Sequence, residues 1–284
     1  MQEKQASWTA TYTAVLRAAH QILDATPKIL DDPVAVGLVE GASEADIRAQ
    51  AADLQQPLQR LARACLVLRS RFAEDHLAEA VKAGVRQYVI LGAGLDTFAY
   101  RQPAWATTLR VMEVDHPASQ AFKRHYLHHA HVAVPDNVAF CPIDFERTTL
   151  QQGLGAVAFD PQVPTFFSWL GVTQYLTSAA IEATLQCVLP LPAGSGIAFT
   201  FILPNASLEG EDLQAAHLLA ALVASRGEPW LTRFEPALLR QWLRALGFAE
   251  VVHLAPPLAE ERYFTGRHDG LRAPILEQLM YAMA

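Results

Sequence analysis

Apolar residues in the first part of the chain recur at the spacing of a helix face. This spacing predicts helices over residues 8–25 and about 57–83. Along the second helix, one stripe collects Leu58, Leu61, Cys65, Leu68, Phe72 and Leu77. Gly84 follows directly, and glycine is a favoured residue after a helix because it adopts left-handed backbone conformations without strain. The pattern therefore predicts a helical N-terminal part.

From residue 86 onward, short apolar runs replace the helical spacing. Helical patterns at about 116–129 and 177–189 separate several of these runs. The runs read RQYVILGAG, LRVMEVD, VAFCPIDF, PTFFSWLG and SGIAFTFILP. Buried strands that alternate with helices are typical of a mostly parallel sheet covered by helices on both faces. The sequence therefore predicts an α/β fold of the Rossmann-like kind.

A chain of 284 residues suits one large domain. We expect a helical N-terminal cap over 1–83, a core over 84–204 and a helix-rich insertion over 205–232. Residues 233–284 return to the core with a helix and a strand, separated by the stop residue Gly247. Open α/β sheets bind ligands at the carboxyl ends of their strands, where the insertion is expected to lie as a lid.

Composition limits the classes of partner. Hydrophobic residues make up 51% of the chain, and the formal net charge is −7 without a long block of like charge. Nucleic-acid binding needs a basic face and is therefore not expected. The first residues hold no apolar leader, and no run of about 18 apolar residues could span a membrane. We expect a soluble, cytoplasmic protein with no membrane partner; the oligomeric state is not predicted.

Neither the cysteines nor the histidines indicate a metal site or a disulfide. Cys65, Cys141 and Cys187 are widely spaced, and the chain has no CxxC motif, so buried thiols are expected. His125 and His129 could share a helix face, a spacing that zinc sites use. No HExxH motif accompanies them, and the basic residues before them favour a solvated helix end. We therefore predict no bound metal.

A glycine loop follows the first predicted strand. Gly92-Ala93-Gly94 would let a ligand approach the backbone, although an ordinary tight turn has the same sequence. Dinucleotide-binding loops continue with a third glycine, where this chain has Thr97. The carboxylate of Asp96 would also repel a phosphate group. The loop therefore disfavours a nicotinamide dinucleotide.

Two acids end the next predicted strand. Asp115 lies about 20 residues beyond Gly94, with Glu113 beside it, and a carboxylate there can accept hydrogen bonds from a ribose diol. Asp115 also precedes His116-Pro117, so plain capping of a helix is the alternative. Together with the glycine loop, these acids indicate a protein that binds a nucleoside but has no loop for binding a phosphate group. S-adenosyl-L-methionine fits that description.

Several segments between residues 30 and 190 resemble one family in order and in sequence. They are DDPVA, SRFAEDHL, GVRQYVILGAGLDTFAYR, EVDHPASQAFKR, PIDFE and GVTQYLT. The chain resembles the leucine carboxyl methyltransferase-like family, which includes protein phosphatase and polyketide O-methyltransferases. The resemblance implies a class I methyltransferase fold and S-adenosyl-L-methionine as the methyl donor.

The resemblance also implies roles for residues. Arg71, within SRFAEDHL, matches the arginine that binds the donor's carboxylate, and a planar guanidinium suits that group. The segment Gly92, Ala93 and Gly94, with Asp96 after it, matches the loop under the donor's amino-acid tail.

The remaining matches concern the nucleoside. Asp115 matches the acid that binds the ribose, with Glu113 as its neighbour. Asp144 and Phe145 match the pair beside the adenine, where the carboxylate faces the exocyclic amine.

Two positions depart from the family pattern. Leu170 stands where many members have the glutamate of EGVLxYL, and Phe98 replaces an arginine common after GLDT. These differences favour the bacterial small-molecule branch over the phosphatase-modifying branch. No general base is assigned, because Tyr175 and His116 suit core and capping roles.

The predicted activity is O-methylation of a small-molecule carboxylate or hydroxyl. Two alternatives remain open at this point: a non-catalytic protein that binds S-adenosyl-L-methionine, and a nicotinamide-dependent oxidoreductase.

Overall fold

The computed structural model describes residues 6–144 and 147–284, which fold around one seven-stranded sheet. The strand order is β3-β2-β1-β4-β5-β7-β6. The strands are β1 (Gln87–Leu91), β2 (Arg110–Asp115), β3 (Val138–Pro142), β4 (Thr165–Trp169), β5 (Gly196–Ile202), β6 (Glu250–Leu254) and β7 (Glu277–Met283). Only β7 runs against its neighbours among these strands, so the predicted mostly parallel sheet is confirmed.

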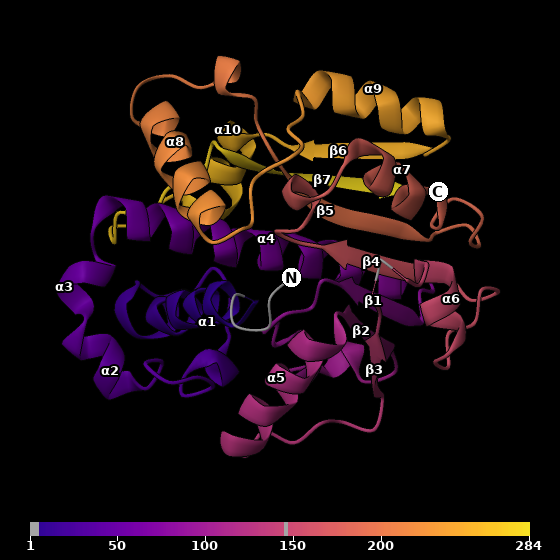
Figure 1. The fold of residues 1–284 in the computed structure, drawn as a ribbon, viewed down its shortest axis with the longest axis horizontal. Coiled ribbons are helices and arrows are strands. Elements are labelled where there is room, and N and C mark those ends of the chain that lie inside the picture. The colour runs from indigo at the N-terminus through magenta and orange to yellow at the C-terminus, as the bar shows by residue number, and fades with distance from the viewer. Residues whose placement is uncertain (1–5, 145–146) are drawn as a thin grey trace.

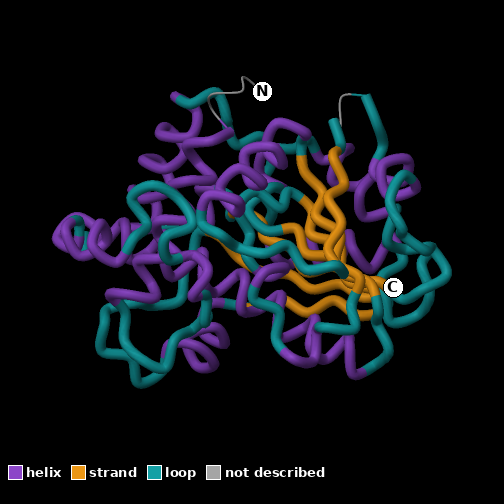
Figure 2. Tube along the Cα trace, turned by 90° about the horizontal axis from the view of Figure 1, so that it is seen from below, coloured by secondary structure: helices purple, strands orange, loops and turns teal. Residues whose placement is uncertain are grey.

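Helices cover both faces of the twisted sheet, as predicted (Figures 1 and 2). One apolar core joins α4 and α10 to one face, and another joins α6, α7 and α9 to the opposite face. The helices are α1 (Ala6–Leu23), α2 (Glu44–Ala49), α3 (Ala51–Leu54), α4 (Pro57–Lys82), α5 (Pro117–His129), α6 (Leu150–Gly155), α7 (Ser178–Gln186), α8 (Gly210–Ser225), α9 (Pro236–Leu246) and α10 (Pro256–Ala259). Single helical turns lie at Pro33–Ala35, Phe98–Tyr100, Ala104–Ala106, Thr173–Tyr175 and Asn205–Ser207, and a π-helix lies at Glu260–Phe264.

The predicted helix ends agree with the backbone. Helix α4 begins with Pro57, whose missing N–H costs nothing at a first helical position, and it ends at Lys82. Gly84 follows with φ +111°. Gly247 ends α9 in the left-handed conformation, with φ +119°. At both positions a side chain would strain the backbone, so glycine sets where the helix ends.

Strand β7 was not predicted. Its sequence, EQLMYAM, is a short apolar run, and periodicity alone does not separate such a run from a buried helical turn. The strand pairs antiparallel with β5 and with β6, so β6 joins the sheet only through β7. Glu277, the first residue of β7, pairs with Ile202 at the carboxyl end of β5.

The carboxyl ends of the parallel strands meet the N-terminal helices and the region around α8. Figure 1 shows α1 and α8 on the side of the sheet toward which the β6 arrow points. The Thr9 hydroxyl donates to Glu228 Oε2 at 3.2 Å, and the Leu231 N–H donates to Gln174 O at 2.7 Å. These contacts tie the segment after α8 to α1 and to the loop after β4.

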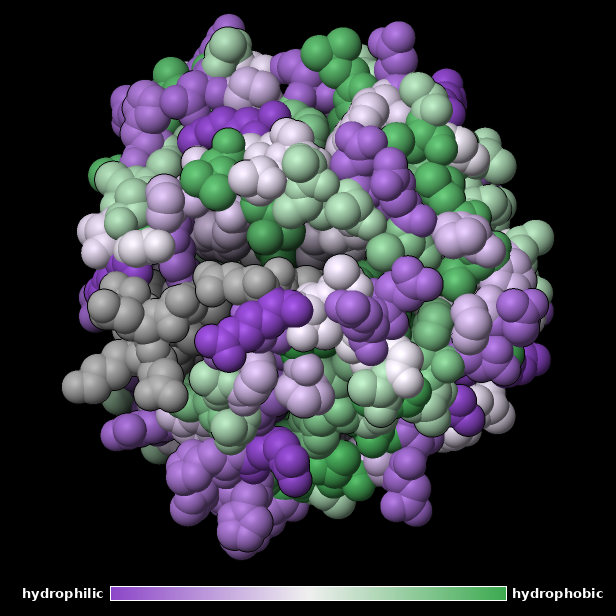
Figure 3. Space-filling view, turned by 45° about the vertical axis from the view of Figure 1, so that its right-hand side comes forward, coloured by the Kyte–Doolittle hydropathy of each residue, from purple (hydrophilic) through white to green (hydrophobic). Residues whose placement is uncertain are grey.

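The surface mixes polar and apolar side chains, as the face in Figure 3 shows. Helix α8 exposes Leu218, with 63% of its surface accessible, and Leu222 with 38%. No helix within the described residues has the length and apolar character needed to cross a membrane.

A buried polar cluster joins α1 to α4. Arg63 is fully buried and donates two hydrogen bonds of 2.7 Å to the Asp24 carboxylate. His20 Nδ1 lies 2.8 Å from the same carboxylate. Burial alone would raise the pKa of Asp24, but hydrogen bonds from His20 and Arg63 lower it below its usual range. The carboxylate is therefore held ionised within the protein.

We predict that Asp24→Ala lowers the free energy of unfolding by roughly 3–5 kcal/mol, because Arg63 is left buried without its counter-charge. Urea unfolding measures the change. Glu44→Ala is the control, since Glu44 pairs with Arg48 at 2.7 Å on the surface of α2, and exposed pairs are worth about 0.3–0.5 kcal/mol. Equal effects of the two substitutions would contradict a stabilising role for Asp24.

Candidate functional site

The glycine loop lies where β1 ends. The N–H groups of Gly92 and Ala93 donate to Val114 O, at 2.8 and 3.1 Å, which binds the loop to the end of β2. Gly92 has φ +67° and Gly94 has φ +43°, a region that disfavours side chains. A Cβ at Gly92 would also lie 2.5 Å from Val172 Cγ2. Ala93 between them is buried in the apolar core, so the two glycines offer bare backbone at the carboxyl edge of the sheet.

Asp115 holds this loop in place from the neighbouring strand. Its Oδ2 accepts from the Gly94 N–H at 2.6 Å, and its Oδ1 accepts from the His116 N–H at 2.7 Å. The cap of α5 is His116, whose Nδ1 accepts from the Ala118 N–H at 3.2 Å. Each carboxylate oxygen keeps a further lone pair, so Asp115 can still accept hydrogen bonds from a ligand.

The carboxylate of Glu113 already bonds to other side chains of the protein. It is fully buried, and its two oxygens accept from Lys123 Nζ at 2.7 Å and from the Tyr100 hydroxyl at 2.9 Å. Burial raises the pKa of Glu113, and the Lys123 ammonium opposes that rise. A ligand could reach this carboxylate only if one of these partners left. We therefore assign Glu113 a structural role, joining β2 to α5, in place of the ligand contact that the resemblance implies.

The Asp96 side chain forms a hydrogen bond to the backbone of its own loop. Its Oδ1 accepts from the Phe98 N–H at 2.8 Å. Beside it, Arg17 of α1 donates through Nη2 to Leu95 O. Burial lowers the pKa of Arg17, whereas Asp32 and Asp96 act to raise it. The Arg17 side chain therefore brings a buried cation to the glycine loop.

Arg17 also carries an unsatisfied donor. Its Nε is buried and lies 3.9 Å from Asp32 Oδ2, close enough for an ion pair, but it has no hydrogen-bond partner within the part of the chain that the structure describes. A buried N–H without a partner costs free energy that a bound acceptor would recover. Arg17 is therefore a candidate to bind a carboxylate over the loop, and sequence reasoning missed it.

The structure separates two neighbouring arginines of α4. Arg71 is 47% exposed and pairs with Asp75 at 2.6 Å. It lines a cavity that includes no residue of the glycine loop among the described residues. Arg69 is 20% exposed and pairs with Glu277 at 3.4 Å. A Cβ at Gly171, just beyond β4, would clash with the Arg69 guanidinium. Arg69, and not Arg71, thus lies at the carboxyl edge of the sheet.

The predicted adenine-binding pair is described only in part. Asp144 follows β3, beside Asp115, because the Ile143 N–H donates to Asp115 O at 2.9 Å. Its Oδ2 lies 3.4 Å from Arg147 Nε, and Arg147 is highly exposed. Phe145 lies outside the described residues. Asp115 and Asp144 therefore sit side by side at the edge that the glycine loop enters.

The far end of this edge holds polar groups from β4, β5 and β7. The Gly171 N–H donates to Thr200 Oγ1 at 2.7 Å, which fixes the turn after β4. Leu170 is half-buried and packs on the apolar core. Glu277 accepts from Cys65 Sγ at 2.9 Å in addition to its pair with Arg69. The neighbourhood of Leu170 therefore contains a carboxylate, supplied by β7 instead of by the loop itself.

Tyr175 lies near the same groups. Burial raises the pKa of its hydroxyl, and the charges of Glu228 and Glu277 act in the same direction. The hydroxyl therefore stays protonated and can donate a hydrogen bond. The sequence offered a signal for Gly171, a glycine that ends the predicted apolar run PTFFSWLG, but none for Glu277, because β7 was not predicted.

Comparisons with known proteins agree with this architecture. The family model described as leucine carboxyl methyltransferase matches residues 10–189. YktD of Bacillus subtilis strain 168, which carries a provisional assignment as an S-adenosyl-L-methionine-dependent methyltransferase, is 31% identical over 96% of each chain. Rv0830 of Mycobacterium tuberculosis, with the same provisional assignment, is 32% identical over 72% of this chain and 70% of its own.

Solved structures share the fold. A structure from Thermobifida fusca, provisionally titled a methyltransferase, matches with a TM-score of 0.56 and 17% identity, covering 95% of this chain and 93% of its own. A DUF574 family protein from Streptomyces avermitilis matches with a TM-score of 0.54 and 16% identity, covering 94% and 96%.

Proposed function

The chain belongs to the leucine carboxyl methyltransferase family, and from this premise we propose that it transfers a methyl group from S-adenosyl-L-methionine to an oxygen atom of a small molecule. The coarser assignment, an S-adenosyl-L-methionine-dependent methyltransferase, follows from the family and from the relatives. The donor site of this proposal is supported by one observation above all. A loop with two glycines, a braced carboxylate and a buried arginine whose Nε makes no hydrogen bond gather at one edge of the sheet.

The residues present fit the donor. The backbone of Gly92 to Gly94 would lie under the amino-acid tail, and Asp115 would accept hydrogen bonds from the ribose hydroxyls. Asp144, beside Asp115, would face the adenine amine. We assign the donor's carboxylate to Arg17 and Arg69, because both lie at this edge and Arg71 does not.

When bound, the donor supplies a methyl group that its sulfonium charge already activates toward a nucleophile. The protein's own residues then have to align the acceptor and keep water out. A carboxylate acceptor is ionised at neutral pH and needs no base, whereas a hydroxyl does. Glu277 is the group that we propose accepts a hydrogen bond from an acceptor hydroxyl, with the protonated Tyr175 donating a second one.

The insertion supports a closed site. Residues after α8 contact both α1 and the loop after β4, through Glu228 and Leu231. Leu231 is itself 58% exposed, so the segment bridges the edge without forming a deep core. We propose that residues 205–232 cover the acceptor during transfer.

Calorimetric titration tests the donor. S-adenosyl-L-homocysteine should bind with micromolar affinity, while NAD should give no saturable heat, because Asp96 and Thr97 replace the features that a pyrophosphate needs. Formation of S-adenosyl-L-homocysteine with a panel of small carboxylates and phenols then separates an enzyme from a binding protein without activity. Tight NAD binding together with no response to either adenosyl ligand would rule out the proposal.

Asp115→Ala should weaken binding of S-adenosyl-L-homocysteine by about 1–3 kcal/mol, the range for lost hydrogen bonds to a charged acceptor. Titration calorimetry measures the loss, and circular dichroism checks that the fold persists. Asp160→Ala, a change at an acid remote from this edge, serves as the control. Unchanged affinity in Asp115→Ala would leave Asp115 only its role of bracing Gly94.

Arg69→Ala should lower donor affinity at least tenfold, the effect of losing a charge-assisted hydrogen bond of about 1.5–3 kcal/mol. Arg71→Ala, two positions along the same helix, should leave donor affinity within twofold of wild type, because its side chain points elsewhere. The same titrations compare both variants. The opposite ranking would return the carboxylate-binding role to Arg71.

A further inference from the structure

A cavity of about 700 Å³ lies apart from the glycine loop. It opens between α4, the turn of residues 25–29 and the segment of residues 262–268. We call it the α4 cavity. Its volume lies in the range of small-molecule sites. None of Gly92, Gly94, Asp115 or Asp144 lines it, among the residues that the structure describes.

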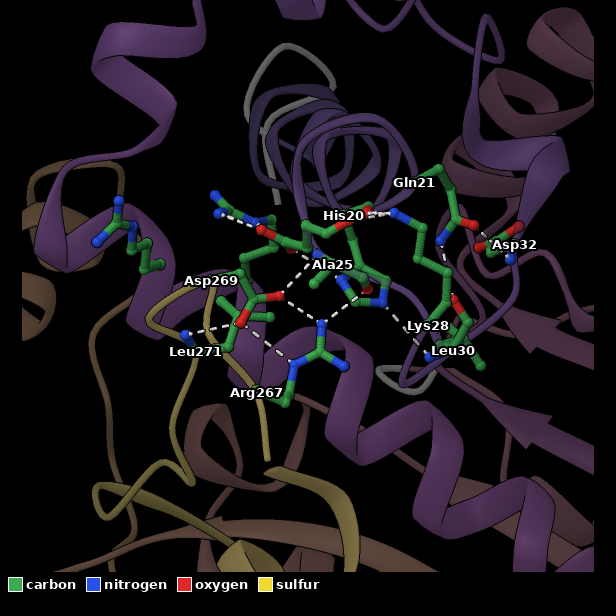
Figure 4. A network of polar contacts seen from close by, with 12 residues as sticks. His20, Gln21, Ala25, Lys28, Leu30, Asp32, Arg267, Asp269 and Leu271 are labelled. Atoms are coloured by element: carbon green, nitrogen blue, oxygen red, sulfur yellow. Dashed lines mark hydrogen bonds and ion pairs between the residues drawn. The ribbon is translucent and has the colours of Figure 1, made fainter. Parts of the chain in front are cut away.

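One wall of the α4 cavity is fixed by polar contacts, which Figure 4 shows. Arg267 donates to Pro27 O at 2.8 Å and to Ala25 O at 3.0 Å, and it pairs with Asp269. The Ala25 N–H donates to Asp269 Oδ2 at 2.8 Å. Lys28 Nζ donates to His20 O at 2.9 Å. The turn is therefore held in place from both ends, and the wall needs no ligand to form.

Another part of the lining comes from a π-helix, Glu260–Phe264. This conformation is rare and often marks functional sites, because the extra residue per turn turns side chains toward a new direction. Buried Phe264 anchors the turn in the core, while Arg262 and Tyr263 line the cavity. The Tyr263 hydroxyl donates to Asp75 Oδ2 at 2.9 Å, which ties the π-helix to α4.

Four cations line the cavity, Lys28, Arg71, Arg262 and Arg267, together with two carboxylates, Asp75 and Glu79. The charge of Arg267 is balanced by Asp269, and Lys28 donates to backbone carbonyls, so Arg71 and Arg262 are the cations that remain for a ligand. A cavity with available guanidinium N–H groups attracts anions.

The two carboxylates are already satisfied by neighbours. Asp75 accepts from Arg71 at 2.6 Å and from Tyr263, and Glu79 pairs with Lys82 at 2.8 Å. Arg71 keeps further N–H groups, since a guanidinium has five. Arg262 makes no ion pair within residues 6–144 and 147–284. Two guanidinium groups that line the same cavity, one from α4 and one from the π-helix, are thus available to one ligand.

We propose that the α4 cavity is a second binding site, which takes a small organic anion through a phosphate or carboxylate group held between Arg71 and Arg262. Arginine binds both groups through paired N–H donors, so the shared chemistry is that of an oxyanion. Pro27, Ile29 and the rings of His76 and Tyr263 offer carbon surface to the body of such a ligand. This site is independent of the proposed methyl transfer.

Titration calorimetry with inorganic phosphate and with citrate, at fixed ionic strength, tests the site. Wild-type protein should bind one of them saturably, and the one that binds shows whether the ligand carries phosphate or carboxylate. Arg71→Ala and Arg262→Ala should each weaken that binding about tenfold, the effect of losing a charge-assisted hydrogen bond. Arg48→Ala is the matched control, because Arg48 also pairs with an acid four residues away on an exposed helix face.

Two results would overturn the proposal. One is the absence of saturable binding of both anions to wild-type protein. The other is equal anion affinity in wild type, Arg71→Ala and Arg262→Ala. Arg71→Gln, which keeps a polar side chain, repeats the measurement if Arg71→Ala lowers the melting temperature. Titration with S-adenosyl-L-homocysteine keeps this outcome separate from the proposed function, since Arg71→Ala should bind it normally.

Discussion

The contact between Asp24 and Arg63 is the constraint on which both candidate sites depend. It fixes the end of α1 against α4 inside the protein, where neither charge could remain without the other. Arg17 lies on α1 about two helical turns before Asp24, which directly follows the helix, so this contact also sets where the Arg17 guanidinium meets the loop. After Asp24 the chain enters the turn of residues 25–29, which lines one side of the α4 cavity. The buried Asp24–Arg63 pair therefore positions residues beside both the glycine loop and the α4 cavity.

Neighbouring side chains of like charge have different roles because they face different parts of the protein. Arg69 and Arg71 are two residues apart on α4, so one faces the sheet edge and the other faces the α4 cavity. Glu113 and Asp115 lie on the same strand, yet Lys123 and Tyr100 engage the first, and the glycine loop engages the second. In each pair the residue type alone does not decide the role; the surrounding groups do.

Much of the fold could be predicted from the sequence, because its signals are local. The apolar runs locate β1 to β5, and Gly84 and Gly247 mark helix ends through their backbone freedom. What could not be predicted depends on distant partners. Strand β7 is paired on both sides, with β5 and with β6, and the buried role of Glu113 needs a lysine on the next helix.

The choice between the two arginines was within reach of the sequence. Cys65 and Phe72 belong to the predicted apolar stripe of α4, and Arg69 follows the first by four positions and precedes the second by three. That spacing turns Arg69 toward the sheet. Strand β7 has a consequence for the order of assembly: it follows β6 along the chain but lies between β5 and β6. During synthesis β6 therefore has no place in the sheet until β7 leaves the ribosome, and Glu277 reaches Arg69 only at that late step.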